Sequence, residues 1–282
     1  FGAPLAIEGL LAFFMEATFV AIMFFGWKKV SPGFHLASTW LTALGASISA
    51  LWILVANAWM QYPVGMEFDP AQMRNVMDDF WAVAFSPVAI HKFLHAVFDG
   101  WVMAAVFVIG VSAWFLLKNT RRDLALKSIK VSGWVGLVGM ILTLWSGDGS
   151  AVDVARVQPM KLAAMEGLYD GGRGQEIVGI GILDPSKQRT DDKDPYLFKI
   201  AIPYGLSFLA THDINGFVPG INDLIEGREI TAEGDTVKTV SYAERIARGK
   251  LAHEALRAFD RAMTVDDKAA MESARADLKV NY

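Results

Sequence analysis

Three polar side chains recur every four residues within one strongly apolar stretch, at His91, His95 and Asp99. On a helix they form a single stripe, and the apolar run continues to Leu117, which is about the length that crosses a bilayer. Lipid offers such groups no partner, so the stripe must face protein, a cofactor or a water-filled path. A neutral imidazole is also a good ligand for haem iron. The residues alone leave two interpretations open: an iron ligand, or polar groups that pair with each other near the helix end.

Two carboxylates lie inside the first apolar stretch, at Glu8 and Glu16. Eight residues of an α-helix advance about 80° around the axis and about 12 Å along it, so both side chains share one broad face. A buried carboxylate is costly unless it is protonated, paired or hydrated. Two such groups in series suggest a proton path or a cofactor site. The alternative is a structural carboxylate that hydrogen-bonds to a neighbouring helix.

A lysine and a glutamate follow the last apolar stretch, at Lys161 and Glu166. Five residues correspond to about 140° on a regular helix, so the two side chains would point to different sides. Pro159 favours an irregular helix start, and a kink there would let both side chains contact one ligand. An exposed pair of this kind is usually solvated and contributes little. The residues alone therefore leave a ligand-binding pair and a solvated pair open.

The composition is that of a membrane protein rather than a soluble one. Hydrophobic residues make up 53% of the 282 residues, and they are clustered rather than dispersed. The formal net charge of −4 is small and argues against nucleic acid as a partner. With no cysteine, the sequence has neither disulfides nor thiolate metal sites. The sequence starts at Phe1 and ends directly after a helical pattern, so we expect an internal fragment of a longer protein.

Four apolar stretches are expected to cross the membrane as helices. The second contains small residues such as Gly45 and Ser49, which let helices approach closely. It also contains Asn57, whose amide needs a partner. The fourth is short, and we expect the glycines Gly147 and Gly149 to end it. The expected spans are about 4–27, 36–60, 88–117 and 131–147.

The loops between these spans differ in charge. Residues 28–35 and 118–130 are rich in lysine and arginine, whereas residues 61–87 are acidic. Strict alternation places the two basic loops on one side, and the positive-inside rule makes that side cytoplasmic. Residues 61–87 and 148–282 are therefore expected outside.

The external part contains shorter elements. We expect a helix at 152–169, a strand at 177–183, a charged turn-rich loop at 184–195, a strand or buried segment at 198–209, and amphipathic helices at 241–263 and 264–279. The sequence therefore predicts an all-α membrane protein. Its four-helix transmembrane region occupies residues 1–147, and a mostly helical external loop domain with minor strand occupies residues 148–282.

Longer motifs carry a resemblance to a known family. In chain order they are GAPLAIEGLLAFFMEATFV, ALWILVANAWMQYP, the helix start HKFLHAV and QPMKLAAMEG. In these segments the sequence closely resembles subunit I of the cytochrome bd-type quinol oxidases, and the similarity is weaker after residue 170. The resemblance implies that the four spans are the third to sixth of nine. The family's N-terminal histidine helix and the methionine that completes its low-spin haem are not among these 282 residues.

The resemblance also implies cofactors. His95, in KFLH, matches the family's ligand of the low-spin haem b iron. Lys92 and Asn57 match polar residues that lie near the haems. A further haem b and a haem d would occupy the oxygen site of the full complex. The resemblance assigns no role to Asp99 or His91.

The remaining polar residues match the proton and quinol sites of the family. Glu8 and Glu16 match the buried acids of the proton and oxygen-reducing region. Lys161 and Glu166, in KLAAME, match the lysine and glutamate of the quinol loop. The resemblance implies that Lys161 orients a quinol oxygen while Glu166 accepts its proton.

The resemblance implies a subunit of a terminal respiratory oxidase, which oxidises membrane quinol and reduces dioxygen to water. It would work with a second membrane subunit in the bacterial cytoplasmic (inner) membrane, with residues 148–282 on the periplasmic side. The isolated fragment is not expected to be active. Two alternatives are a membrane b-type cytochrome that only transfers electrons, and a non-haem transporter subunit. Glu8 and Glu16 argue against the first, since an electron carrier needs no buried acids; in the second, the histidines would line a pore.

Overall fold

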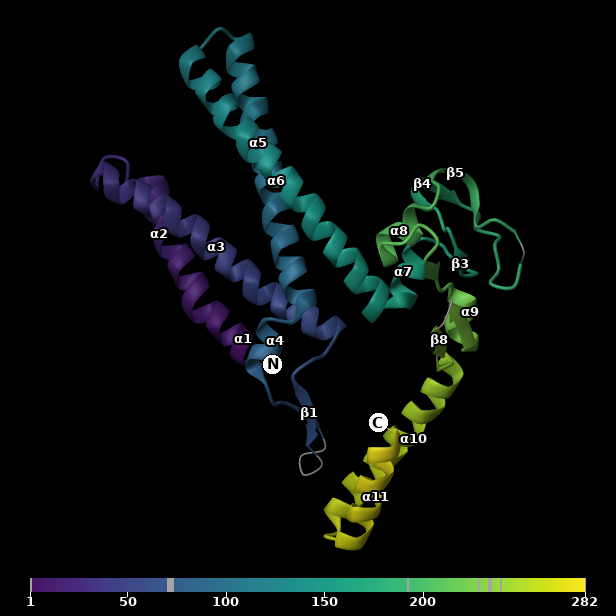
Figure 1. The fold of residues 1–282 in the computed structure, drawn as a ribbon. Coiled ribbons are helices and arrows are strands. Elements are labelled where there is room, and N and C mark those ends of the chain that lie inside the picture. Colours follow the sequence, from purple (N-terminus) through teal and green to yellow (C-terminus); the bar gives the residue numbers. More distant parts are fainter. Residues whose placement is uncertain are drawn as a thin grey trace. The chain divides into compact units, whose positions relative to one another are not determined.

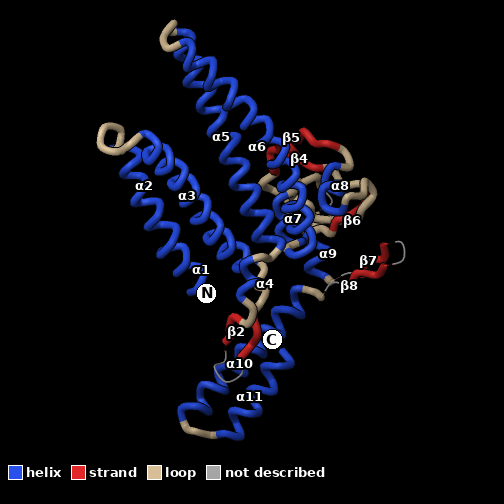
Figure 2. Tube along the Cα trace, turned by 60° about the vertical axis from the view of Figure 1, so that its left-hand side comes forward, coloured by secondary structure: helices blue, strands red, loops and turns tan. Residues whose placement is uncertain are grey.

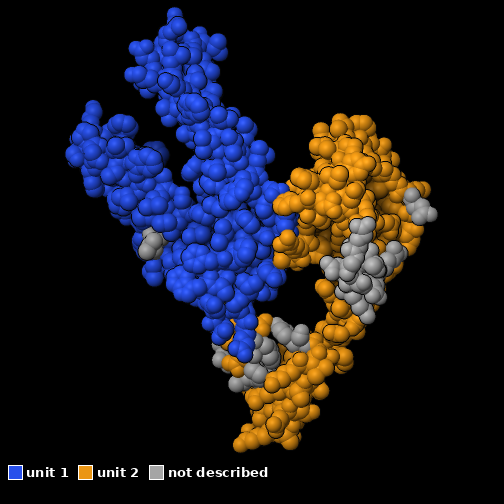
Figure 3. All heavy atoms as spheres, in the orientation of Figure 1, with its two compact units in different colours: residues 1–67, 77–153 blue, residues 68–76, 154–282 orange. Residues whose placement is uncertain are grey.

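The computed structural model describes residues 2–69, 74–191, 193–227, 229–232, 235–238 and 240–281. The chain divides into two compact units, which have different colours in Figure 3. Unit 1 spans residues 1–67 and 77–153, and unit 2 spans residues 68–76 and 154–282.

Unit 1 is built from long helices (Figure 1). Two of them begin at a Ser-Pro pair, where the Ser31 and Ser86 hydroxyls accept hydrogen bonds from amides of the first turn at 3.3 and 3.2 Å. Serine caps an amide that has no partner within the helix, and the proline that follows has no N–H to satisfy. The elements from Gly2 to Val157 are α1 (Gly2–Ile7), the π-helix η1 (Glu8–Phe13), α2 (Phe14–Phe25), α3 (Pro32–Gln61), β1 (Met66–Asp69), β2 (Arg74–Met77), α4 (Phe80–Ala84), α5 (Pro87–Leu117) and α6 (Arg122–Val157).

The expected number of spans is confirmed, because four segments are long and apolar enough to cross a membrane, although the fourth begins at Arg122 and not at residue 131. These are Gly2–Phe25, Pro32–Gln61, Phe80–Leu117 and Arg122–Val157. Their burial pattern is the reverse of a soluble core. Ser38, Ala58 and Ala105 are buried between helices, whereas Phe107 is 71% exposed and Leu144 is 70% exposed. Small residues let the helices approach closely and large apolar side chains face lipid, so unit 1 is a multi-pass membrane region.

The expected end of the fourth span at Gly147 and Gly149 is wrong, because α6 continues through both glycines. A Cβ at Gly147 would lie 3.0 Å from Cε1 of His95, and one at Gly149 would lie 2.8 Å from Nε2 of His91. The glycines therefore allow the histidine face of α5 to contact the backbone of α6, and they do not terminate the helix. The compact unit accordingly extends to Asp153, beyond the expected boundary at residue 147.

Unit 2 contains short helices and two-stranded sheets, and Figure 2 shows the strands in red. β4 and β5 form its longest hairpin, which is antiparallel and runs from the pair Ile177↔Ile202 to the pair Leu183↔Tyr196. The elements are α7 (Pro159–Met165), β3 (Gly172–Arg173), β4 (Ile177–Leu183), β5 (Tyr196–Ile202), α8 (Gly205–Thr211), β6 (Phe217–Val218), α9 (Ile221–Glu226), β7 (Glu229–Ala232), β8 (Asp235–Lys238), α10 (Tyr242–Thr264) and α11 (Lys268–Asn281).

The helix expected at 152–169 is interrupted. α6 ends at Val157 and α7 starts at Pro159, with Gln158 between them at φ −139° and ψ 57°. A proline disfavours the helical conformation of the residue before it, which explains the break. The expected irregular start at Pro159 is therefore confirmed.

Other expectations for unit 2 are largely confirmed. The strand at 177–183 is β4, and the two amphipathic helices are α10 and α11, which pack through a cluster that includes Ala252, Ala255 and Leu278. The apolar segment at 198–209 divides between β5 and α8. A second buried cluster joins α7, α8 and β6 and consists of Leu162, Leu206, Ala210 and Val218. This cluster fixes α7 beside the β4–β5 hairpin.

Candidate functional site

His95 on α5 is half-buried, and its ring contacts the backbone of α6. Its Nδ1 lies 3.2 Å from the carbonyl oxygen of Thr143 and 3.3 Å from the hydroxyl of Ser146. In the tautomer that donates from Nδ1 to this carbonyl, Nε2 carries the lone pair. Nε2 has no hydrogen-bond partner among the residues that the structure describes. A hydrogen bond on one ring nitrogen is the usual way in which a protein orients a metal-binding histidine.

His91 lies one turn earlier on α5 and has a different partner on α6. Its Nδ1 is 2.7 Å from Oδ2 of Asp153, and the two side chains are 29% and 18% exposed. Asp99, the third member of the predicted stripe, is exposed. His91 and His95 on α5 therefore both contact α6, whereas Asp99, on the same helix, is exposed. The histidines pair with groups of α6 and not with each other.

Lys92 contacts α3 instead. Its Nζ donates a hydrogen bond to Oδ1 of Asn57 at 2.9 Å, and Nε2 of Gln61 donates to the same oxygen at 3.0 Å. Asn57 thus has the partner that an amide in a membrane span requires. Sequence reasoning missed Gln61, although its position four residues after Asn57 could have indicated a shared helix face.

The two acids of the first span are separated by the π-helix η1. Glu8 is the first residue of η1, and Glu16 lies three residues after its end at Phe13. A π-turn holds more residues than an α-turn. The eight-residue step from Glu8 to Glu16 is therefore closer to two whole turns than it would be on a regular α-helix. Oε1 of Glu8 accepts a hydrogen bond from the Ser49 hydroxyl at 2.9 Å. Both acids are half-buried, and at Gly45 the backbone of α3 comes so close that a Cβ would lie 3.2 Å from the Glu16 nitrogen.

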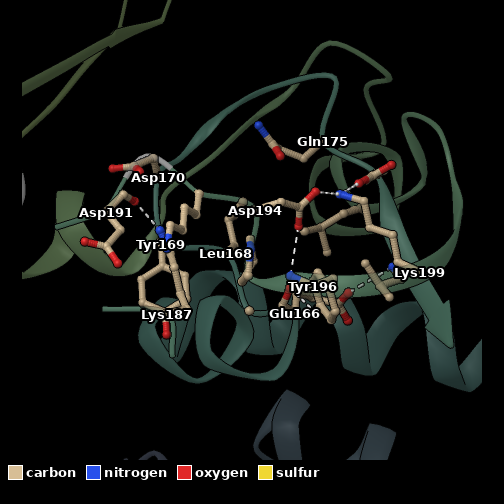
Figure 4. A pocket seen from close by; sticks show the side chains of 16 residues that line it. Glu166, Leu168, Tyr169, Asp170, Gln175, Lys187, Asp191, Asp194, Tyr196 and Lys199 are labelled. Carbon is tan, nitrogen blue, oxygen red and sulfur yellow. Dashed lines mark hydrogen bonds and ion pairs between the residues drawn. The ribbon is translucent and has the colours of Figure 1, made fainter. Parts of the chain in front are cut away.

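A pocket of about 310 Å³ lies in unit 2 beside the end of α7 (Figure 4). Glu166, Tyr169, Lys187, Tyr196 and Lys199 are among the residues that line it. The Lys187 Nζ sits 4.8 Å from the centre of the Tyr169 ring, in cation–π contact. The volume is at the lower end of the range for small-molecule sites. Aromatic rings beside charged groups suit a flat, aromatic headgroup that carries polar substituents.

Glu166 is held at the end of α7 by both strands of the neighbouring hairpin. Its Oε2 accepts a hydrogen bond from the Val178 amide of β4 at 3.3 Å, and its carbonyl accepts one from the Tyr196 hydroxyl of β5 at 2.8 Å. Lys161, in contrast, is exposed in the first turn of α7 and does not line the pocket. The structure therefore does not bring Lys161 and Glu166 into one pocket.

Two residues of β5 shape the electrostatics of the pocket wall. Burial raises the pKa of Tyr196, and the nearby charge of Glu166 raises it further, so the hydroxyl stays protonated at neutral pH. Hydrogen bonds to Asp194 and Glu176, at 2.7 and 2.6 Å, raise the pKa of Lys199. Sequence reasoning missed Tyr196 and Lys199, because only the folded chain places them in the same pocket as Glu166. A lysine within the apolar run of β5 was the one signal that could have marked this wall.

Comparison with known proteins gives the family. The sequence model of the family described as Cytochrome bd terminal oxidase subunit I matches residues 1–261. The chain belongs to this family. The resemblance seen in the sequence motifs is thereby confirmed.

Two curated members of the family are similar over most of the chain. The chain is 44% identical over 225 residues to the cytochrome bd-II ubiquinol oxidase subunit 1 of Escherichia coli (strain K12). This match covers 80% of the chain and 43% of the relative. The chain is 37% identical over 254 residues to the cytochrome bd ubiquinol oxidase subunit 1 of Bacillus subtilis (strain 168). This match covers 88% of the chain and 53% of the relative. The chain thus spans about half the length of these curated relatives.

A solved structure shows the same fold. The bd oxidase from Geobacillus thermodenitrificans aligns with 99% of the chain and 63% of its own chain, with a TM-score of 0.66 and 23% sequence identity. The chain therefore shares its fold with this bd oxidase.

Proposed function

We propose that the chain is part of subunit I of a terminal respiratory oxidase that oxidises membrane quinol and reduces dioxygen to water. Its curated relatives are named ubiquinol oxidase subunits. Its partners in this proposal are quinol, dioxygen, the lipid bilayer and a second membrane subunit. The complex would lie in the bacterial cytoplasmic membrane, with residues 148–282 on the external side.

The orientation of His95 is the observation that carries this proposal. Its Nδ1 is hydrogen-bonded to α6, so its Nε2 would be the atom that holds the low-spin haem b iron. A bound haem supplies one-electron transfer. The Thr143 carbonyl holds the imidazole in the ligating tautomer. Lys92 and Asn57 contribute polar groups between α5 and α3. The further haem b and the haem d of our proposal belong to the oxygen site of the full complex.

On the quinol side, Glu166 would accept the proton that a quinol hydroxyl loses on oxidation. It lines a pocket of suitable size, and the Val178 amide fixes one of its carboxylate oxygens. Lys161 is exposed and does not line this pocket, so it would contact a second quinol oxygen only if the ring extends beyond the pocket. On the oxygen side, Glu8 and Glu16 would relay protons, since a half-buried acid in a span is suited to that task.

The test uses the full-length complex in membranes. His95→Ala should remove the low-spin haem b absorption, whereas His91→Gln should keep it, because His91 has its own partner on α6. Haem d bands in the unmodified complex are expected for the oxidase. A spectrum with b bands alone would identify an electron carrier, and a spectrum without haem bands would identify a transporter; either result would overturn the proposal.

A further inference from the structure

Tyr196 contacts the glutamate of the quinol pocket through its hydroxyl. Figure 4 shows the two side chains next to each other, and the Tyr196 hydroxyl donates to the main-chain carbonyl of Glu166 at 2.8 Å. Glu166 is the C-cap residue of α7, and the chain turns immediately after it at Gly167, where φ is +58°. The bond therefore ties this turn to β5. It leaves the Glu166 carboxylate available to the Val178 amide and to the pocket.

The Tyr196 ring occupies a slot that two glycines create. A Cβ at Gly167 would lie 2.9 Å from the Tyr196 hydroxyl, and a Cβ at Gly181 would lie 2.6 Å from Cδ1 and Cε1 of the ring. A larger residue at either position would push the ring out. Such contacts fix the direction of the hydroxyl, which a freely rotating surface tyrosine would not have.

The charges around the ring keep the hydroxyl a donor. The pKa of Tyr196 is raised by burial and then by the charge of Glu166, so the neutral phenol persists at neutral pH. Lys199 lies 5.8 Å from the ring centre, and its own charge is balanced by Asp194 and Glu176. The phenol is thus available for hydrogen bonding to Glu166 but is not itself a proton acceptor.

We propose that Tyr196 is a positioning residue for quinol oxidation, which aims the Glu166 carboxylate at the quinol hydroxyl. The inference rests on the proposed function of Glu166 and assigns a further residue to the same site. Tyr196 takes no part in the proton transfer, in which the Glu166 carboxylate would accept a proton from the quinol oxygen. Proton transfer requires the acceptor within hydrogen-bond reach of its donor, so a misdirected carboxylate slows turnover more than it weakens binding.

The experiment measures quinol oxidation by the complete oxidase complex. Tyr196→Phe keeps the ring and loses one neutral hydrogen bond, so we expect kcat to fall about two- to tenfold with little change in KM. Gly181→Ala, which displaces the ring without altering Tyr196 or Glu166, should have the same effect. Tyr242→Phe on α10 is the matched control and should behave as the wild type. Oxygen consumption with an artificial donor that bypasses quinol should be unchanged in all three.

A double-mutant cycle separates positioning from a general structural role. If Tyr196 acts through Glu166, Tyr196→Phe should cause no further loss of kcat in a Glu166→Gln background. A loss of equal size in both backgrounds, or wild-type kcat in Tyr196→Phe, would overturn the inference and leave the role of Glu166 intact. Wild-type quinol turnover in Glu166→Gln alone would instead refute the proposed function of the pocket.

Discussion

Nδ1 of His91 lies 2.7 Å from Oδ2 of Asp153, and this contact ties α5 to α6 one helical turn from His95. Both side chains are less than a third exposed. A hydrogen bond that involves a charged group is worth about 1.5–3 kcal/mol, and removal of one partner leaves the other unsatisfied. The pair therefore stabilises the contact between the helix that carries the proposed haem ligand and the helix that orients it.

The first prediction concerns this tie. Asp153→Ala should lower the thermal midpoint of the detergent-solubilised complex, because it removes the partner of His91. Asp99→Ala, in the same polar stripe of α5, should change the thermal midpoint little, since Asp99 is exposed. The low-spin haem b absorption should survive in Asp153→Ala, because Thr143 still holds His95. Loss of that absorption would show that the tie acts directly on the ligand.

The second prediction uses the glycines of α6. Gly147→Ala should shift or abolish the low-spin haem b absorption, because its Cβ would come within 3.0 Å of the His95 ring. Gly133→Ala on the same helix is the matched control, since a Cβ at that position meets nothing within 4 Å. The spectrum of the reduced complex provides the measurement. An unchanged spectrum in Gly147→Ala would show that His95 is not held against α6 in the complex.

These glycines also show where sequence reasoning ends. Apolar length, a property of a single segment, predicts α5 closely, whereas α3 begins at Pro32, before the expected residue 36. The sequence predicts that Gly147 and Gly149 end the helix, but their role depends on His95 and His91, more than fifty residues away in the chain. The interruption of α1 and α2 by η1 has no simple sequence signal either. Long-range contacts of this kind are fixed by packing and not by local propensity.

The candidate site divides in the same way. His95, Glu8 and Glu166 could be selected because charged or ligating groups in or next to apolar spans are conspicuous. Tyr196 could not, because its importance follows from the register of the β4–β5 hairpin and from the space beside Gly181. Residue type and spacing predicted which chemistry is present, whereas the walls of the pocket required the fold.

The third prediction concerns the acids of the first span. Glu16→Gln keeps the side-chain volume but removes a titratable group, so it should slow oxygen reduction more than quinol binding. The reaction of the pre-reduced complex with oxygen in a stopped-flow experiment isolates this step. Ser49→Ala removes only the hydrogen bond to Glu8 and serves as the comparison. A normal oxygen reaction in assembled Glu16→Gln complex would exclude Glu16 from the relay.

The fourth prediction is the topology. The sequence contains no cysteine, so single cysteines in an otherwise cysteine-free complex report their own accessibility. Ser186→Cys, in the part that we expect outside, should react with a membrane-impermeant maleimide in intact cells. Thr120→Cys, in the basic loop between α5 and α6, should react only after the membrane is permeabilised. The opposite pattern would invert the orientation that the positive-inside rule predicts.

The last prediction separates Lys161 from Glu166. Lys161 lies in the first turn of α7 and Glu166 is the C-cap of that helix. Glu166 lines the pocket, whereas Lys161 is exposed and does not line it. Glu166→Ala should lower kcat for quinol strongly, because it removes the proposed proton acceptor. Lys161→Ala should mainly raise KM if the quinol ring extends across α7 to its ammonium group. Steady-state kinetics with quinol on the full complex distinguish these effects, and a bypass donor reports that oxygen reduction is intact. Lys250→Ala, a change of the same kind at an exposed position of α10 that does not line the pocket, is the control for loss of one positive charge in this unit. Equal kinetics for Lys161→Ala and the control would confine the quinol site to the Glu166 side of the helix, as the geometry of the pocket alone would suggest.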